Sequence, residues 1–546
     1  SSNANLNGLS ARTTLNPAYL SFANAVLKAR GEKDDRVYQK LEINTAKSGD
    51  KLNAAWNEER SALWADDYGT IKADYLKATS TSTGNWAKMS YEVGLPSYNV
   101  EVIMEWGMNA VLYATNGGVV SVGDMSGKRS AICANGDGAN GVLAGGAGTK
   151  AGTSEAKSDT AKVYVYNTDF SLDGWNNHVA DVVYGGYAYL EKVHATTGKS
   201  GSYAVGQGSA LANDFGNGIV EAKDFHATVY GNRSAGVYVI GGGIITAKNS
   251  SFNSRMDAGV LVAAATGSKA LAHYMMSDAM MTLGQLCKNY NVSPEKTKTL
   301  LATLGKLAGK SYTKDTSLRN SVLDNTFYNY SAGQYIGDTD FTDIPYLTVG
   351  SCFGGLTSSV FEFESAGVNL ELNNCTFKNT NNENYNYLIS SESGSAPVLK
   401  FNQSNASGII WNEGDVFRFC EGRPADRSSQ LTVCFNESTF NGSFADGYNG
   451  LWEVKGLAYA NNSGETTSMN GNYYKAKANW GNSASFNENS TWIVNHDSYL
   501  GSLTIEAGST VKAPEGCSLV MTVNGQETSL EPGTYKGQII IKVTKN

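Results

Sequence analysis

Acidic residues gather in one short stretch of the chain, "GDTDFTD" at 337–343. It contains Asp338, Asp340 and Asp343, and the alternation of side chains along a strand would place Asp338 and Asp340 on the same face. Carboxylates arranged in this way are suited to binding a hard cation or to working as an acid/base pair. We therefore take this stretch as the candidate metal site, with calcium as the cation. A solvated acidic loop is the alternative.

Aromatic residues are abundant, with 30 Tyr and 9 Trp. Rings on the outer face of a sheet are suited to stacking on sugars or to contacting proteins. The segment "LDGWNNHVADVV" at 172–183 places Trp175 among polar residues, and Tyr184 and Tyr187 follow it closely. These three are the candidate carbohydrate-binding residues, and a turn closed by a packed Trp175 is the alternative.

The other motifs with catalytic potential fail on spacing. The triple glycine of "GNRSAGVYVIGGGIITAKNSSFNS" (231–254) lacks both the Gly-Lys pair of a phosphate-binding loop and the GxGxxG spacing. The five His residues are scattered, without HExxH or CxxC motifs for zinc. Ser293 in "SPEK" is explained better as a helix cap than as a nucleophile. The sequence thus provides no catalytic residues and favours a protein that is not an enzyme.

Length and charge narrow the possible classes. A chain of 546 residues exceeds one compact domain, so it either divides into domains or grows by repetition. Its net charge of -8 argues against nucleic acid as a partner. No apolar run reaches 18 residues, so we expect it not to be an integral membrane protein. No basic and apolar leader precedes Ser1, so an exported protein would already have lost its signal.

The first part of the chain shows helical spacing. "NPAYLSFANAVLKARG" (16–31) begins with a capping Asn16 and Pro17, carries apolar residues on one face and ends at Gly31. "DKLNAAWNEERSALWADDYG" (50–69) follows the same logic. These segments predict an N-terminal helical cap or assembly segment over residues 1–92.

From about residue 97, the helical spacing gives way to short runs of β-branched and aromatic residues closed by Gly, Asn or Asp. Many runs end with a small polar tripeptide and a Phe, at Phe170, Phe225, Phe252, Phe327, Phe377 and Phe440. With loops allowed for, their gaps fit a repeat of about 25 residues, typical of a solenoid. The longest gap contains residues 267–309, whose spacing predicts an inserted helical hairpin.

The segment 231–254, the Phe endings and the tail at 490–543 resemble right-handed parallel β-helix proteins. They are similar to the secreted, adhesin-like group within the pectate-lyase-like class. The resemblance covers about residues 100–545. The predicted N-terminal helices and the insertion at 267–309 do not share it. We therefore expect an all-β fold, a right-handed parallel β-helix solenoid over 93–512, which carries the N-terminal helical cap and the inserted helical hairpin.

One coil can be drawn residue by residue. Val237 and Val239 would face inward with Tyr238 outward, and Gly241 to Gly243 would form a corner. Residues 249–251 would form the next corner. Coils stack about 4.8 Å apart, so equivalent Asn side chains can form ladders and Phe rings can stack.

Two of the seven Cys residues, Cys352 and Cys375, are about one coil apart in the sequence. They would then lie one above the other, as a possible disulfide or as a stacked pair of thiols.

The two ends of a solenoid expose strand edges that invite assembly. At the C-terminal end, Asn524 and Gly525 separate two apolar runs, which predicts a hairpin or strand cap over 513–546.

Three functions remain open from the sequence. The first is an exported protein, secreted or at the cell surface, with a structural or adhesive role. It would self-assemble end to end into a homo-oligomer or filament and contact cell-surface glycans or proteins. The second is a polysaccharide lyase or glycoside hydrolase, since β-helix enzymes of this class act on polysaccharides with clustered Asp, a basic residue and often calcium. The third is a trimeric, glycan-binding fibre of the phage-tail type.

Overall fold

The structure of this chain is a computed structural model. It describes residues 25–45, 60–80, 110–135, 139–145, 160–174, 177–199, 208–214, 218–230, 234–254, 261–262, 293–295, 335–336, 339–340, 348–349, 361–379, 387–391, 396–412, 430–446, 449–450, 465–467, 473–475 and 478–546. Nearly all regular structure in these ranges is β. One hydrogen-bonded network holds 29 of the described strands.

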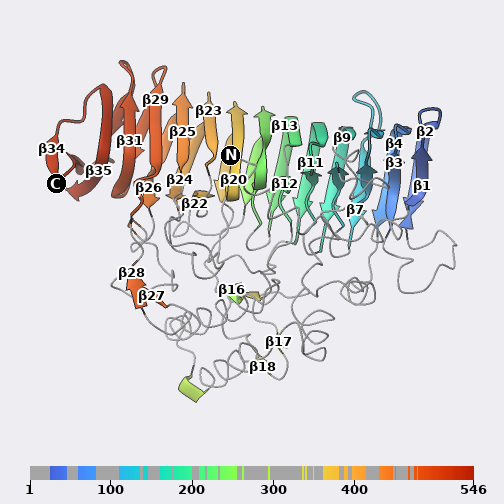
Figure 1. Ribbon diagram of the computed structural model, residues 1–546, viewed down its shortest axis with the longest axis horizontal. Helices are drawn as coiled ribbons and strands as arrows, with labels where there is room; N and C mark the ends of the chain where they lie inside the picture. The colour runs from blue at the N-terminus through green and yellow to red at the C-terminus, as the bar shows by residue number, and fades with distance from the viewer. Residues whose placement is uncertain are drawn as a thin grey trace.

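Most of these strands pair in three parallel ladders that run the length of the molecule. We call one passage of the chain through the first, second and third ladder a rung. The rungs follow one another in chain order, from β1 and β2 at the blue end of Figure 1 to the red strands at the opposite end. Together with a buried aromatic stack, these long parallel sheets are consistent with a parallel β-solenoid.

Some strands belong to one ladder only. Those of the first ladder are β1 (Ala25–Arg30), β3 (Ser61–Asp66), β5 (Leu112–Ala114), β8 (Val142–Ala144), β10 (Ala180–Val182), β12 (Leu211–Asp214) and β22 (Tyr387–Ser391). Those of the second are β6 (Val119–Val122), β23 (Val398–Asn402), β25 (Leu431–Asn436) and β29 (Asn482–Asn487). Those of the third are β7 (Ser130–Ala134), β15 (Ser251–Ser254), β21 (Thr376–Asn379), β30 (Thr491–Val494) and β32 (Thr510–Lys512).

Longer strands bend from one ladder into the next. The strands that pass from the second ladder to the third are β2 (Asp35–Asn44), β4 (Thr70–Ser80), β9 (Lys162–Leu172), β11 (Tyr187–Thr197) and β13 (Gly218–Val229). The strands β14 (Val237–Lys248) and β20 (Phe361–Asn373) pass from the first ladder to the second, and β31 (Ser498–Ile505) pairs in parallel with β29 of the second ladder. The strands β24 (Asn405–Asn412) and β26 (Thr439–Asp446) pass from the third ladder to the first ladder of the next rung.

Three two-stranded sheets lie outside the network. They are the parallel pair β16 (Leu261–Val262) and β19 (Thr348–Val349), and the antiparallel pairs β17 (Tyr335–Ile336) with β18 (Thr339–Asp340) and β27 (Glu465–Thr467) with β28 (Tyr473–Lys475).

The rung drawn from the sequence is confirmed. Val237, Val239 and Ile245 are fully buried, whereas Tyr238 is partly exposed. The register of β14 against β20 shifts between Ile240 and Gly242, so the glycines mark the bend between ladders. No phosphate-binding helix follows them, because the chain continues as β14 and β15.

The corner between the second and third ladders needs a single residue in the left-handed region. Asn249 (φ 51°) takes this position between β14 and β15, and Asn374, Gln403 and Glu437 take it in later rungs. The residue after each of these is buried and lies inside the corner. Its side chain therefore decides how consecutive corners are joined.

Serine hydroxyls join most of these corners. The N–H of Ser404 donates to the Oγ of Ser438, and the N–H of Ser438 donates to the Oγ of Ser490, each over 3.1 Å. The N–H of Ser490 donates to Ser509 in the same way. These buried backbone donors are satisfied from rung to rung, which supports the stacking.

An asparagine ladder runs beside the hydroxyls. The Nδ2 of Asn402 donates to the Oδ1 of Asn373 over 2.8 Å, and the Nδ2 of Asn436 donates to Asn402 over the same distance. Asn487 extends the ladder to Asn436 over 3.2 Å. The predicted Asn ladder is thus present.

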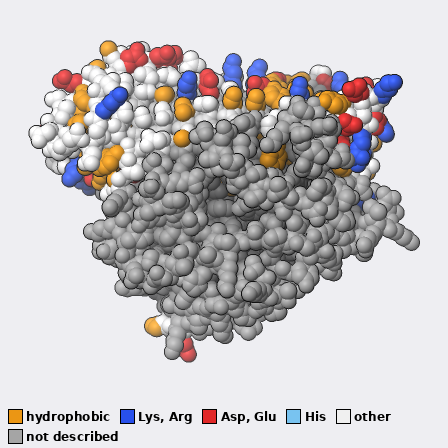
Figure 2. Space-filling view, in the orientation of Figure 1, with side chains coloured by type: hydrophobic (Ala, Val, Ile, Leu, Met, Phe, Trp, Pro, Cys, Tyr) orange, Lys and Arg blue, Asp and Glu red, His pale blue; other side chains and the backbone are white. Residues whose placement is uncertain are grey.

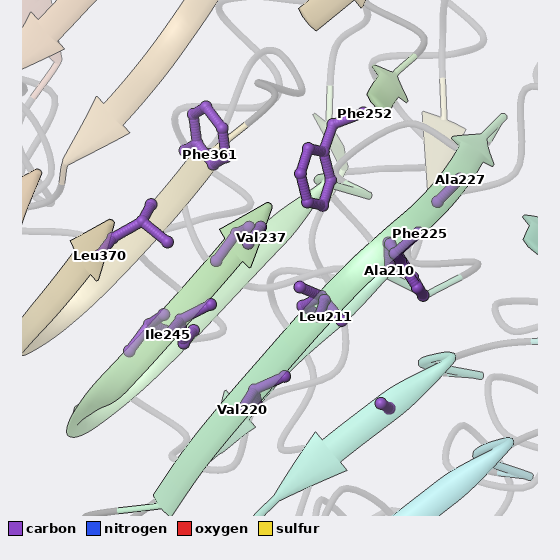
Figure 3. Close-up of a cluster of buried hydrophobic side chains, with 14 of the residues drawn as sticks. Ala210, Leu211, Val220, Phe225, Ala227, Val237, Ile245, Phe252, Phe361 and Leu370 are labelled. Carbon is purple, nitrogen blue, oxygen red and sulfur yellow. The ribbon is translucent and has the colours of Figure 1, made fainter. Parts of the chain in front are cut away.

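Aromatic rings stack inside the solenoid. The rings of Phe401 and Phe486 each lie 5.0 Å from the ring of Phe435, and all three are fully buried. Figure 3 shows Phe225, Phe252 and Phe361 in the same core, among aliphatic side chains. Offset stacking adds to the burial of apolar area. The predicted Phe stack is present in the described rungs.

The predicted N-terminal helical cap is wrong wherever this region is described. Residues 25–30 and 61–66 form β1 and β3, which pair in parallel, and β3 pairs onward with β5. Trp64 explains the outcome, because it is fully buried and stacks 5.3 Å from Tyr113 of the next rung. A pattern that also fits a helix is decided here by contacts between rungs.

A carboxylate ties these first rungs together. Asp66 is fully buried and accepts hydrogen bonds from Arg30 (2.9 Å), Thr115 (2.7 Å) and Asn116 (3.1 Å). The buried carboxylate therefore has hydrogen-bond partners in the rung before its own and in the rung after it.

The C-terminal strands change direction. β33 (Cys517–Val523) and β34 (Gln526–Thr528) form an antiparallel hairpin around Asn524 and Gly525, which both have positive φ. β35 (Gly533–Lys545) pairs antiparallel with both β31 and β33. The hairpin expected from Asn524-Gly525 is therefore present.

The predicted hairpin at 267–309 falls almost wholly outside the described residues. Pro294 and Glu295 are helical there and follow Ser293.

Candidate functional site

The outer face of the second ladder carries a group of tyrosines. The strands β9 ("KVYVYN") and β11 ("YAYLEK") alternate, so that buried Val163 and Val165 leave Tyr164 and Tyr166 facing outward. In β11 the outward residues are Tyr187 and Tyr189. We call Tyr164, Tyr166, Tyr187 and Tyr189 the tyrosine platform.

The register between β9 and β11 brings these four rings together. Tyr164 lies directly opposite Tyr189. The ring centroids are 5.8 Å apart for Tyr187 and Tyr164, 6.4 Å for Tyr164 and Tyr189, and 5.8 Å for Tyr189 and Tyr166. The four rings therefore form a continuous chain across two rungs.

Two carboxylates orient the phenols. The hydroxyl of Tyr187 donates to Glu221 Oε2 over 2.5 Å, and that of Tyr189 donates to Glu191 Oε1 over 2.6 Å. Loss of solvent and these hydrogen bonds raise the pKa of Tyr187 and of Tyr189 above the usual value for tyrosine. Both phenols are therefore neutral donors at physiological pH.

The surface around the platform combines charged and apolar groups. Glu221, Lys223 and Lys248 are exposed on the next two rungs, and Ile244 leaves 47% of its surface exposed beside them. Figure 2 shows hydrophobic side chains among acidic and basic ones along the upper edge of the described surface. Rings flanked by hydroxyls and charges can bind a partly polar ligand by stacking and hydrogen bonding.

Of the three predicted carbohydrate-binding residues, the platform contains Tyr187. Tyr184 lies in the turn between β10 and β11 and packs against a separate cluster that includes Trp64 and Tyr113. Trp175 lies outside the described residues. Tyr164, Tyr166 and Tyr189 were missed, although alternating Tyr residues in "VYVY" and "YAY" were a usable signal.

The predicted calcium site stays a prediction. Asp338 and Asp343 lie outside the described residues, and Asp340 is placed only through its backbone in β18, opposite Tyr335. Among the side chains that the structure does describe, no group of three or more His, Cys, Asp or Glu is placed to hold a metal ion.

The Cys pair is also left open. Cys375 is a buried free thiol, and it lies in the corner position that Ser404 takes one rung later. Cys352 lies outside the described residues, so its position relative to Cys375 stays a prediction.

A second polar group lies on the outer face of the third ladder. His226 Nε2 is 2.8 Å from Asp224 Oδ1, and His226 Nδ1 is 2.7 Å from Ser251 Oγ. His194 from the preceding rung packs edge-on against His226, with ring centroids 5.7 Å apart. Asp224, His226 and Ser251 therefore form one chain of side-chain contacts at hydrogen-bond distance. It lies open to solvent, with 39% of the His226 side chain and 52% of the Asp224 side chain exposed.

The residues around Trp175 separate in space. Asp173 forms a surface ion pair with Lys199 over 2.9 Å. His178 is buried, accepts a hydrogen bond from the N–H of Ser209 and stacks on Tyr238. Asp181 is buried in β10. The grouping in the sequence is therefore not a grouping on the surface.

Comparison with models of protein families finds no match, and comparison with curated proteins finds no relative. Within the described ranges, no helix combines the length and the apolar character needed to cross a membrane.

Proposed function

We propose that this chain is an exported, right-handed parallel β-helix with a structural and adhesive role at the cell surface or outside the cell. The right-handed sense follows the strong preference of parallel strand crossovers. The tyrosine platform is the observation that carries the proposal. It presents aromatic and hydrogen-bonding groups on the outside of a scaffold whose stacking depends on buried side chains.

The ladders also support a structural role. Buried Ser and partly buried Asn side chains link successive corners, and stacked Phe rings lie in the interior. A scaffold of this kind holds its outer faces at fixed spacing, which favours extended ligands over small ones.

Assembly through the ends is part of the proposal. Among the described strands, β1 and β2 have ladder partners on one side only, and 66% of the Val37 surface on β2 is exposed. At the other end, β33 to β35 replace the parallel rungs. We expect homo-oligomers or filaments to form end to end, with the N-terminal rung of one copy against the C-terminal strands of the next.

Adhesion and size test the proposal together. The purified chain should be retained on cells or on glycan-coated surfaces, and its sedimenting mass should rise with concentration. A chain that remains strictly monomeric when concentrated, and that binds neither cells nor glycans, would contradict the proposal.

A further inference from the structure

We propose that the tyrosine platform is the binding site for a neutral carbohydrate chain, with Glu191 and Glu221 as acceptors for its hydroxyl groups. This inference rests on the proposed adhesive role and names the class of ligand. It follows from the arrangement of the rings, the state of their hydroxyls and the charge beside them.

The rings are held ready for stacking. Each half-buried ring of the tyrosine platform lies within 6.4 Å of another, and hydrogen bonds to Glu221 and Glu191 fix the two rings of β11. A ligand therefore meets rings whose conformational freedom is already restricted, which lowers the entropy cost of binding. The apolar faces of sugar rings are suited to such surfaces.

The carboxylates select for hydroxyl groups. Each ionised carboxylate accepts about four hydrogen bonds, and the phenol of Tyr187 or Tyr189 uses only one of them. Sugar hydroxyls are donors that can use the remaining capacity. An acidic sugar stacked on Tyr187 or Tyr189 would meet the carboxylate bonded to that phenol, which repels it. Lys162, opposite Tyr187, and Lys223, opposite Glu191, offset part of this repulsion.

The repeat of the scaffold suits a chain rather than a single sugar. Successive rungs lie about 4.8 Å apart, which is similar to the length of one pyranose unit. The tyrosine platform spans two rungs, and Ile219 and Ile244 follow Tyr187 in the same column of outward residues. An extended oligosaccharide can therefore lie across the rungs and contact several of them.

Calorimetric titration of the full chain with cellohexaose, laminarihexaose and hexagalacturonate tests this inference. We expect at least one neutral hexasaccharide to bind and the acidic one to bind at least tenfold more weakly. The double variant Tyr164→Ala/Tyr189→Ala should lose at least tenfold in affinity. Tyr75→Ala, on β4 and two rungs away, should match the wild type.

A charge variant tests the role of the carboxylates separately. Glu191→Gln/Glu221→Gln keeps the rings and should narrow the difference between neutral and acidic ligands. Failure of the wild type to bind either neutral hexasaccharide, or an unchanged affinity in the double Tyr variant, would overturn the inference. If the double Tyr variant still adheres to cells as the wild type does, the platform is wrong and the adhesive role stands. If the wild type does not adhere, the proposed function itself fails.

Discussion

The amide of Cys375 donates a hydrogen bond to the hydroxyl of Ser404, 3.0 Å away in the next rung. The Cys375 thiol in turn lies 3.5 Å from the carbonyl oxygen of Asn373, the contact that Ser404 makes with the carbonyl of Asn402 at 2.8 Å. A thiol therefore replaces one hydroxyl in a ladder of serines. Val193 and Phe225 fill the same position in earlier rungs, so we expect a small side chain with hydrogen-bonding capacity to be required only in the corners that the serine ladder joins.

Replacement of Cys375 tests that requirement. Cys375→Ser should leave the free energy of unfolding within about 0.5 kcal/mol of the wild-type value. Cys375→Val should lower it by about 1–3 kcal/mol, because the carbonyl oxygen of Asn373 loses a hydrogen-bond partner. Denaturant titration measures both. Cys434→Val, on the outer face of β25, is the matched control and should have little effect. Equal stability of the Ser and Val variants would refute the requirement.

Removal of one ring tests the aromatic stack. Phe435→Ala should lower the free energy of unfolding by about 3–5 kcal/mol, because it opens a cavity between Phe401 and Phe486. Thr432→Ala, on the outer face of the same strand, is the control. A loss below 1 kcal/mol for Phe435→Ala would mean that the stack contributes little.

Close approach of neighbouring rungs explains one glycine. A Cβ at Gly186 would lie 2.0 Å from the carbonyl oxygen of Ala144, whereas a Cβ at Gly367 would meet nothing within 4 Å. Gly186→Ala should therefore cost about 1–3 kcal/mol, and Gly367→Ala should be tolerated. Thermal unfolding followed by circular dichroism compares the two. Similar melting temperatures would contradict the packing of these rungs.

Alkaline pH should destabilise the fold. Burial raises the pKa of Tyr113 above its usual value, and it raises the pKa of Cys375 to about 11. In both cases the folded state favours the neutral form. Their contribution to the free energy of unfolding is therefore fully present below the pKa values of the unfolded chain, about 8.5 for Cys and 10 for Tyr. This contribution is lost as the pH rises through the pKa values of the folded state.

The pH dependence can be assigned by mutation. Denaturation midpoints should fall between about pH 9 and 11, and Cys375→Ser should flatten that part of the profile. Tyr113→Phe should flatten the part above about pH 10. A profile that is level over this range in the wild type would contradict the assignment.

Local patterns predicted the repeating parts of the fold. Alternation placed Val237 and Val239 inside and Tyr238 outside, and Asn249 marked a corner because Asn tolerates a positive φ. Asn524 and Gly525 specified their hairpin for the same reason. Each of these features depends on a few neighbouring residues.

Features that depend on contacts between rungs were missed. Residues 50–69 have helical spacing in the sequence, whereas pairing of β3 with β1 and β5 and the stacking of Trp64 on Tyr113 explain the strand. The tyrosine platform needs the register of β9 and β11, which the intervening loop hides from the sequence. The Phe endings suggest that Phe170 and Phe225 are equivalent positions of the repeat. The register shows that they are not, because Phe225 pairs with Val193 of β11, whereas Phe170 pairs with Ala195 of the same strand.

The central claim is that the protein binds a glycan and leaves it intact. The most direct measurement exposes an immobilised neutral β-glucan to the purified chain, then quantifies both the retained protein and the length of the glycan chains. The account predicts retained protein, reduced in the Tyr164→Ala/Tyr189→Ala variant, with glycan length unchanged. Shortened chains with new reducing or unsaturated ends would contradict it and favour a hydrolase or lyase, and absence of retention would contradict it as well.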